Sequence, residues 1–166
     1  MALLAVGFGL LAAGCGYTTS TGLLPSHLKT IAIPVFENST TEYTLEQEIT
    51  DAVIQRFVND NHLKVVDERT ADALLRGKIT SYRNSVFGIA TDQALAQEYR
   101  VTIAVEVSFK DRVKNREIWS EPNLLRTANY YVQDVPGQTA KTELDGRKDA
   151  IDKIADEILS RSVESW

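Results

Sequence analysis

The side chain most suited to a chemical modification is the thiol of Cys15, the only cysteine of the chain. It follows the small, apolar segment Leu10–Gly14, and no Asp, Glu, Lys or Arg occurs before Lys29. An apolar run that ends in small residues is typical of an export signal, and a cysteine directly after it favours acylation of that thiol. We therefore predict a lipoprotein signal peptide over residues 1–14, with Cys15 as the lipid-attachment residue. The alternative is a buried apolar N-terminus with an incidental core cysteine.

The remaining reactive side chains do not form a catalytic or metal-binding pattern. The sequence contains two histidines, His27 and His62, and neither lies in a nucleophile elbow, a phosphate loop or a His-x-x-x-His pair. The carboxylates fit solvated helix and turn positions: Glu46, Glu48, Asp51, Asp67, Glu68 and Asp72. We predict a protein that is not an enzyme and that needs no metal and no cofactor.

Cations at alternate strand positions offer a second kind of chemistry. Arg76, Lys78 and Tyr82 share one parity of a predicted strand, and Arg100 lies on the polar parity of another. Basic side chains held on rigid strands can bind phosphate or carboxylate groups. The alternative is ordinary solvated charge on an exposed sheet face.

The segment 84–97 is a candidate for contact with a partner. We expect a loop there that exposes Val86, Phe87, Ile89 and Leu95, and exposed apolar residues favour contact with a protein or a lipid. The alternative is a disordered loop.

The hydrophobic pattern predicts the elements that must position these groups. Strict alternation over 98–110 predicts a strand with one buried and one wet face. Apolar stripes at helical spacing predict helices over 44–59, with Thr44 and Gln47 as a capping box, and over 139–162, with Leu144 in its buried stripe. Further strands are expected at 29–36, 63–66, 73–83 and 116–119, the last continuing over 124–132.

Particular residues interrupt this pattern. Pro34 places its strand at an edge or breaks it. Gly77 indicates a bulge or the close approach of another backbone, and Gly146 weakens the start of the second helix.

This order of elements predicts one α+β domain. The economical arrangement is a two-layer sandwich, with a mainly antiparallel sheet and two helices packed on one face. Residues 29–166 would form the domain, and residues 15–28, rich in Thr, Ser and Gly, a tether to the lipid. The net charge of −5 argues against a nucleic-acid partner, which favours a basic surface.

Several short motifs, in this order, resemble the family of LPS-assembly lipoproteins called LptE. They are Cys15-Gly16-Tyr17, Ile31–Thr40, Leu45-Glu46, Ala71–Ile79, Arg100 opening a long alternating strand, Trp119 and the amphipathic C-terminal helix. The resemblance implies a non-catalytic protein on the periplasmic side of the outer membrane, held there by acyl chains. It further implies a plug inside the LptD β-barrel that helps deliver lipopolysaccharide to the cell surface.

Two expectations connect this resemblance to single residues. From charge and parity, we expect Arg76, Lys78 and Arg100 to contact lipopolysaccharide phosphates, and from exposure we expect Phe87 and Ile89 to contact the partner. The alternative is a free-standing periplasmic lipoprotein that binds a ligand or regulates an envelope enzyme.

Overall fold

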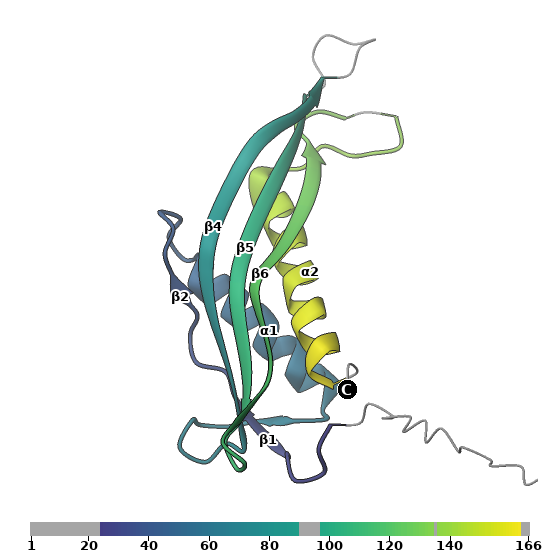
Figure 1. Cartoon of the computed structure of the whole chain (residues 1–166). Helices are drawn as coiled ribbons and strands as arrows, with labels where there is room; N and C mark the ends of the chain where they lie inside the picture. Colours follow the sequence, from purple (N-terminus) through teal and green to yellow (C-terminus); the bar gives the residue numbers. More distant parts are fainter. Residues whose placement is uncertain (1–23, 90–96, 135, 164–166) are drawn as a thin grey trace, which may run out of the picture.

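The computed structural model describes residues 24–89, 97–134 and 136–163 as one sheet with two helices. The predicted signal peptide, Cys15, the tether up to residue 23 and Leu95 lie outside the described residues. Figure 1 shows three long strands, β4, β5 and β6, with α1 and α2 together on one of their faces. The predicted α+β class and two-layer arrangement are therefore confirmed.

The sheet has the strand order β3-β1-β4-β5-β6, with β2 pairing β4 beyond the end of β1. β4 (Ala73–Ile89), β5 (Gln97–Asp111) and β6 (Arg116–Tyr131) form an antiparallel meander. β1 (Thr30–Ala32) pairs in parallel with β3 (Lys64–Val65) and β4, and β2 (Glu37–Asn38) also runs parallel to β4. These parallel pairs arise because the chain crosses over through α1 (Leu45–Asp60) before it returns to the sheet.

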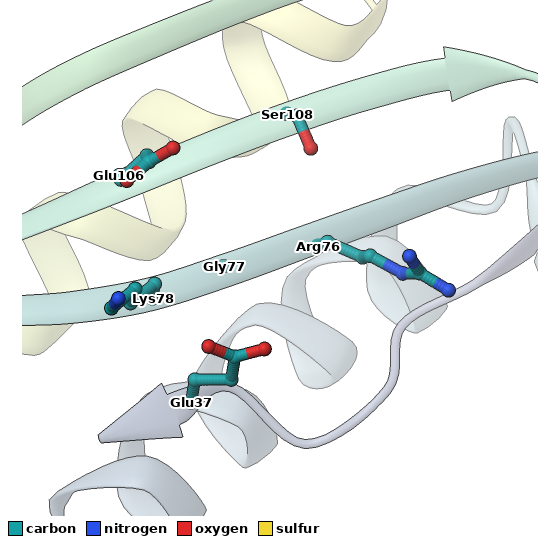
Figure 2. A pocket seen from close by; sticks show the side chains of 6 residues that line it. All are labelled: Glu37, Arg76, Gly77, Lys78, Glu106 and Ser108. Atoms are coloured by element: carbon teal, nitrogen blue, oxygen red, sulfur yellow. The ribbon is translucent and has the colours of Figure 1, made fainter. Parts of the chain in front are cut away.

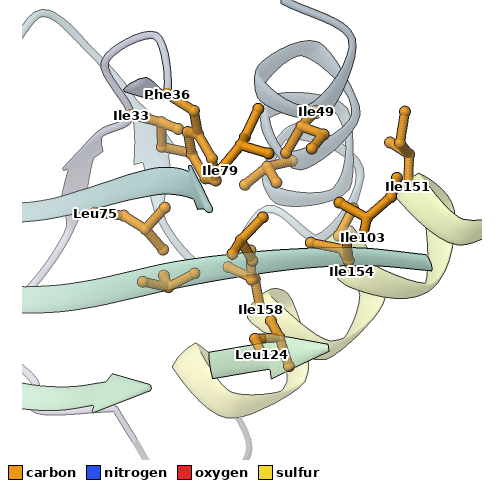
Figure 3. Packing of buried hydrophobic residues seen from close by; sticks show 14 of the residues in the cluster. Ile33, Phe36, Ile49, Leu75, Ile79, Ile103, Leu124, Ile151, Ile154 and Ile158 are labelled. Atoms are coloured by element: carbon orange, nitrogen blue, oxygen red, sulfur yellow. The ribbon is translucent and has the colours of Figure 1, made fainter. Parts of the chain in front are cut away.

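The core lies between the sheet and the two helices. The alternating face of β5 that was predicted to be buried is completely covered, from Val101 to Phe109. Figure 3 shows aliphatic side chains of the sheet meeting Ile49 of α1 and Ile154 of α2 (Glu143–Val163). Leu144 is an exception to the predicted stripe, because it stays 64% exposed in the first turn of α2.

The first strand ends at Ala32, shortly before Pro34, and a break of the strand was one of the two outcomes predicted for this proline. The chain after β1 turns inward, so that the buried ring of Phe36 lies over Gly77 of β4. The predicted close approach at Gly77 is thus real, but its neighbour is this aromatic ring and not a backbone. The β4–β5 register is regular at Gly77 and shifts at Thr80 instead, between Ile79 and Ser81.

The long strands run further than the sequence pattern predicted. β4 continues to Ile89 and β5 starts at Gln97, so the expected loop over 84–97 is wrong for residues 84–89 and for Gln97. β6 also passes through Pro122 without a break. This is possible because β6 is an edge strand and its register with β5 shifts beside Pro122, where a missing N–H costs no ladder bond.

The helix starts also differ from the prediction. Thr44 precedes α1 in the left-handed region with φ 69° and makes no capping bond, so the predicted capping box is wrong. Its hydroxyl donates to Glu48 Oε1 at 2.8 Å instead. A reciprocal capping arrangement occurs at α2, where the Thr142 amide donates to Asp145 Oδ2 and the Asp145 amide donates to the Thr142 hydroxyl.

Ion pairs join the two helices across their shared surface. The guanidinium of Arg56 on α1 binds Asp152 and Asp156 of α2. In the opposite direction, Arg147 of α2 reaches Glu48 at 3.0 Å and its side chain is only 12% exposed. Among the acidic side chains of α2, Glu157 pairs along its own helix with Arg161, whereas Asp152 and Asp156 pair with α1.

Candidate functional site

A polar pocket on the open face of the sheet contains two of the three predicted cations. Arg76 and Lys78 lie at opposite ends of this pocket, with Glu37 of β2 between them (Figure 2). The strand register builds it, because Lys78 is paired with Glu37 on one side and with Glu106 on the other. The helices lie behind the sheet in this view, so the pocket opens away from the core.

The charges in this pocket are nearly balanced. Arg76 Nη2 contacts Glu68 Oε1 at 3.0 Å, and both side chains are largely exposed. Lys78 makes no ion pair within the described residues, although the carboxylates of Glu37 and Glu106 line the same pocket. An exposed ion pair of this kind contributes at most about 1 kcal/mol and exchanges readily for another partner. An anionic group could therefore bind here by replacing Glu68 on Arg76.

Arg100, the third predicted cation, lies at the other end of β5. It is six residues from Glu106, which corresponds to about 20 Å along a strand. The structure therefore does not bring Arg100 together with Arg76 and Lys78. Tyr82 also leaves their face, since the register shift at Thr80 reverses the parity and its hydroxyl donates to Glu143 Oε1 at 2.6 Å.

Arg100 forms a small aromatic and polar site with its neighbours near the end of the meander. Its guanidinium carbon lies 3.2 Å from the ring centroid of Phe87, which sits at a second register shift of β4 and is 50% exposed. Its Nε donates to Asn129 Oδ1 at 2.8 Å, and Asn129 in turn donates to Glu98. Ile89 ends β4 opposite Gln97. This site presents one held cation and one half-exposed ring to a partner.

A buried carboxylate that the sequence pattern did not single out fixes the N-terminal segment to the sheet. Asp111 is fully buried at the end of β5 and contacts His27 Nε2 at 2.8 Å. Burial alone would raise the pKa of Asp111, but the bond from the Lys114 amide and the contact with His27 outweigh it and hold the pKa below its usual value. The expected tether therefore ends before residue 28, since Leu28 is already buried in the core.

Asp72, the residue directly before β4, fixes the same segment at the start of β1. It was expected to be a solvated turn carboxylate, but it accepts bonds from the amides of Lys29 and Thr30, each at 3.0 Å. The Lys29 amide and the Thr30 hydroxyl lower the pKa of Asp72. The only sequence signal for the contacts of Asp111 and Asp72 is an aspartate next to a strand end, and this feature is too common to identify a contact.

The described residues offer neither a membrane-spanning helix nor a metal-binding cluster. None of the described helices combines the length and apolarity needed to cross a membrane. No cluster of three or more His, Cys, Asp or Glu suited to a metal ion occurs in residues 24–89, 97–134 and 136–163.

Solved structures with the same fold are very different in sequence. The chain is similar to protein CT253 of Chlamydia trachomatis, with a TM-score of 0.55 and 12% identity over 81% of this chain and 95% of that one. A putative neuraminyllactose-binding hemagglutinin homolog from Helicobacter pylori gives a TM-score of 0.54 and 13% identity over 85% and 88% of the two chains. Protein XCC0632 of Xanthomonas campestris gives 0.54 and 10% identity over 85% and 90%. At these identities the likeness shows the fold alone.

The comparison of family sequences is more specific. None of the curated proteins searched matches the chain. The sequence model of the LptE family, described as lipopolysaccharide-assembly, matches residues 28–162, which extend from before β1 to the penultimate residue of α2. The match is to an assembly protein, consistent with the prediction that the chain is not an enzyme. The chain belongs to the LptE lipopolysaccharide-assembly family.

Proposed function

We propose that this protein is an outer-membrane lipoprotein that plugs and supports the LptD β-barrel and assists the insertion of lipopolysaccharide into the outer leaflet. Acyl chains on Cys15 would hold it on the periplasmic face. The observation that carries this proposal is the family match over residues 28–162. The predicted signal over residues 1–14 is consistent with export and acylation.

The surface of the domain is suited to a water-filled lumen. The open face of the sheet bears mostly charged and hydroxyl side chains, among them Lys78, Glu106 and Thr102, while most apolar residues of the sheet are buried beneath the helices. Barrel interiors are lined by polar side chains, so a mostly polar face can lie against them without exposing a large apolar surface to water. Acyl chains add about 0.8 kcal/mol per buried methylene, which makes the anchorage firm when more than one chain is attached.

Co-purification is the direct test of this function. The chain would be expressed with its signal in a Gram-negative host, outer membranes solubilised, and a C-terminal tag used for recovery. We expect a large barrel protein in a ratio near one to one. The variant Cys15→Ala should lose the mass of the acyl chains and leave the membrane fraction more readily. A lipidated protein recovered alone would contradict the plug function and favour a free-standing lipoprotein.

The cations define two separate places where lipopolysaccharide phosphates could bind. Arg76 and Lys78 share one pocket, whereas Arg100 lies about 20 Å away beside Phe87. We expect the double variant R76A/K78A and the variant R100A to weaken lipopolysaccharide binding independently, so that their effects add. Lys148→Ala, which removes an exposed cation from α2, is the matched control. Unchanged binding after all three replacements would exclude these cations as phosphate ligands.

Phe87 and Ile89 remain our candidates for contact with the barrel. Phe87 is half exposed at a register shift, where a strand bends and redirects its side chain. We expect Phe87→Ala and Ile89→Ala to reduce barrel recovery in the co-purification. Val113→Ala is the control, because Val113 is 61% exposed in the turn at the opposite end of the meander. Equal recovery of all three variants would contradict this assignment.

A further inference from the structure

The two sides of the β-meander differ in how their backbone edges are protected. On the outer side of β6, cations cover successive carbonyl groups: Arg126 Nη1 donates to the Leu125 carbonyl at 2.7 Å, and Lys153 Nζ donates to the Thr127 carbonyl at 2.8 Å. Further along, the Lys141 amide donates to the Tyr131 carbonyl at 2.7 Å. Covering an edge in this way blocks pairing with another strand.

The outer edge of β4 has no such protection beyond the point where β2 ends. The last contact of the preceding segment is the bond from the Ser39 amide to the Ile79 carbonyl at 3.0 Å. Among the described residues, no hydrogen bond reaches the outward backbone groups of β4 after that point. Figure 1 agrees, since no other element is drawn along the outer side of β4 above β2.

The register identifies which groups are free. The Thr127 carbonyl points outward from β6, so the backbone N–H and C=O groups of Thr102, its partner on β5, point toward β4. Arg83 lies opposite Thr102 on β4, and its backbone N–H and C=O groups therefore point toward β5. Neighbouring residues alternate in direction. The backbone N–H and C=O groups of Tyr82, Asn84 and Val86 therefore point away from β5, toward the open edge of the sheet.

This free edge is preformed and carries one exposed cation, Arg83. Tyr82 is held to Glu143 at 2.6 Å, and Asn84 Nδ2 donates to the Tyr130 hydroxyl at 2.9 Å, so both residues are fixed from the helix side. β4 carries three cations and no carboxylate, although the whole chain has a net charge of −5. Arg83 is exposed on the open face and makes no ion pair within the described residues.

We propose that the outer edge of β4, from Ser81 to Val86, binds an extended, carboxylate-bearing segment of a partner polypeptide as an added strand. Its backbone would bond to the outward groups of Tyr82, Asn84 and Val86, and its acidic side chains would lie beside Arg83. Strand addition of this kind takes its affinity from backbone bonds and its selectivity from neighbouring side chains. The turn before α1 bounds the site at one end, and the register shift at Phe87 bounds it at the other.

Residue-resolved hydrogen exchange on the full chain in detergent micelles tests this inference without any barrel protein. The probe is an acetylated heptapeptide of alternating Val and Glu, and its control carries Lys in place of Glu. In the free protein, we expect fast exchange at Tyr82, Asn84 and Val86 and slow exchange at Arg83 and Ser85. The Glu peptide should slow the three outward amides, and the Lys peptide should bind roughly tenfold more weakly because it meets like charge.

A proline variant separates strand addition from any other contact. Val86→Pro removes an outward N–H that no described group uses, whereas Val86→Thr keeps it. We expect the Glu peptide to bind the threonine variant like the parent and to lose most of its protection of Tyr82 and Asn84 in the proline variant.

Three results would overturn the proposal. The first is an absence of protection by millimolar Glu peptide in the parent chain, a measurement that does not depend on how any variant folds. The second is equal binding of the Glu and Lys peptides. The third is protection of the same amides that appears without peptide and grows with protein concentration, which would assign the edge to a second copy of this chain.

Discussion

Replacing Gly77 by alanine tests the closest packing contact of the fold. An added Cβ at this position would lie within 3.0 Å of three ring carbons of Phe36, a separation that real Cβ atoms do not adopt. The ring cannot withdraw easily, because it is 2% exposed and its own amide donates to the Thr50 hydroxyl at 3.0 Å. Either the ring or β4 must therefore shift.

Overpacking of a core costs about 1–3 kcal/mol. The lower entropy of an unfolded chain with alanine offsets about 0.4–1 kcal/mol of this cost. We expect Gly77→Ala to lower the free energy of unfolding by about 2 kcal/mol, near the upper part of the net range because three ring carbons are involved. For a domain of this size, that corresponds to a fall in Tm of about 4–8 °C.

Urea unfolding followed by circular dichroism measures the effect. Gly88→Ala is the matched control in the same strand, because its added Cβ would meet the end of the Glu98 side chain at 3.3 Å, which can move aside. We expect a change within about 0.5 kcal/mol there. The double variant F36L/G77A should be less destabilised than the sum of its single variants by about 1 kcal/mol. Normal stability of G77A, or additive behaviour of the double variant, would refute the packing argument.

Three further changes test other parts of the fold. In α2, Gly146→Ala gains about 1 kcal/mol of helix propensity, but its Cβ would lie 2.6 Å from the buried Tyr130 ring, so urea unfolding should show a net loss of about 1 kcal/mol. Arg147→Ala removes the guanidinium that reaches α1 and should cost about 1–2 kcal/mol in the same assay. The pKa of Asp111 is lowered in the folded protein, so the unfolded state takes up a proton at a higher pH than the folded state does. The ionised Asp111 carboxylate therefore stabilises the fold above the ordinary pKa of an aspartate, and this stabilisation is lost in acid. Between pH 5 and pH 3, Asp111→Asn should therefore lose less stability than the parent chain, and an equal loss in both would contradict this role.

The sequence predicted best those elements whose two faces differ strongly. β5 alternates apolar and polar side chains along almost its whole length, and only one arrangement buries Val101 through Phe109. The stripe of α1 was equally informative, since Leu45, Ile49, Val53 and Phe57 are all fully buried. In both cases a shift of the buried face by one residue would expose a continuous row of apolar side chains. The pattern alone therefore determines which face of each element lies against the core.

Tyr82 was misplaced for a different reason, which is a single register shift between β4 and β5. Parity along β4 placed Tyr82 beside Arg76 and Lys78, but the extra residue at Thr80 turns it toward α2. Nothing in the local sequence marks Thr80, because a bulge depends on how two strands pair. The predicted loop failed similarly, since residues 84–89 show no regular alternation of polar and apolar side chains, and only the pairing with β5 reveals them as a strand.

Contacts distant in sequence were not predictable by any periodicity. His27 and Asp111 are 84 positions apart, and Asp72 and Thr30 are 42 apart. Gly146 was expected only to weaken its helix, although its missing side chain makes room for Tyr130. Such residues are selected for by the space or the partner that another element provides, which only the assembled structure reveals.

The division of charge between the two layers links the fold to the proposed interactions. The helices α1 and α2 carry ten carboxylates and five basic side chains, so the layer that covers the core accounts for an excess of acid equal to the net charge of −5. β4 is purely cationic and lies in the other layer. The rest of the chain therefore has no net charge, so an anionic lipid or an acidic strand would be repelled from the helical side and attracted on the sheet side only by the local cations of β4, over a distance of about 8–10 Å at physiological salt. If the sheet side is the binding side, raising the salt concentration should weaken both kinds of binding and leave the packing of Gly77 against Phe36 unaffected, because that contact involves no charge.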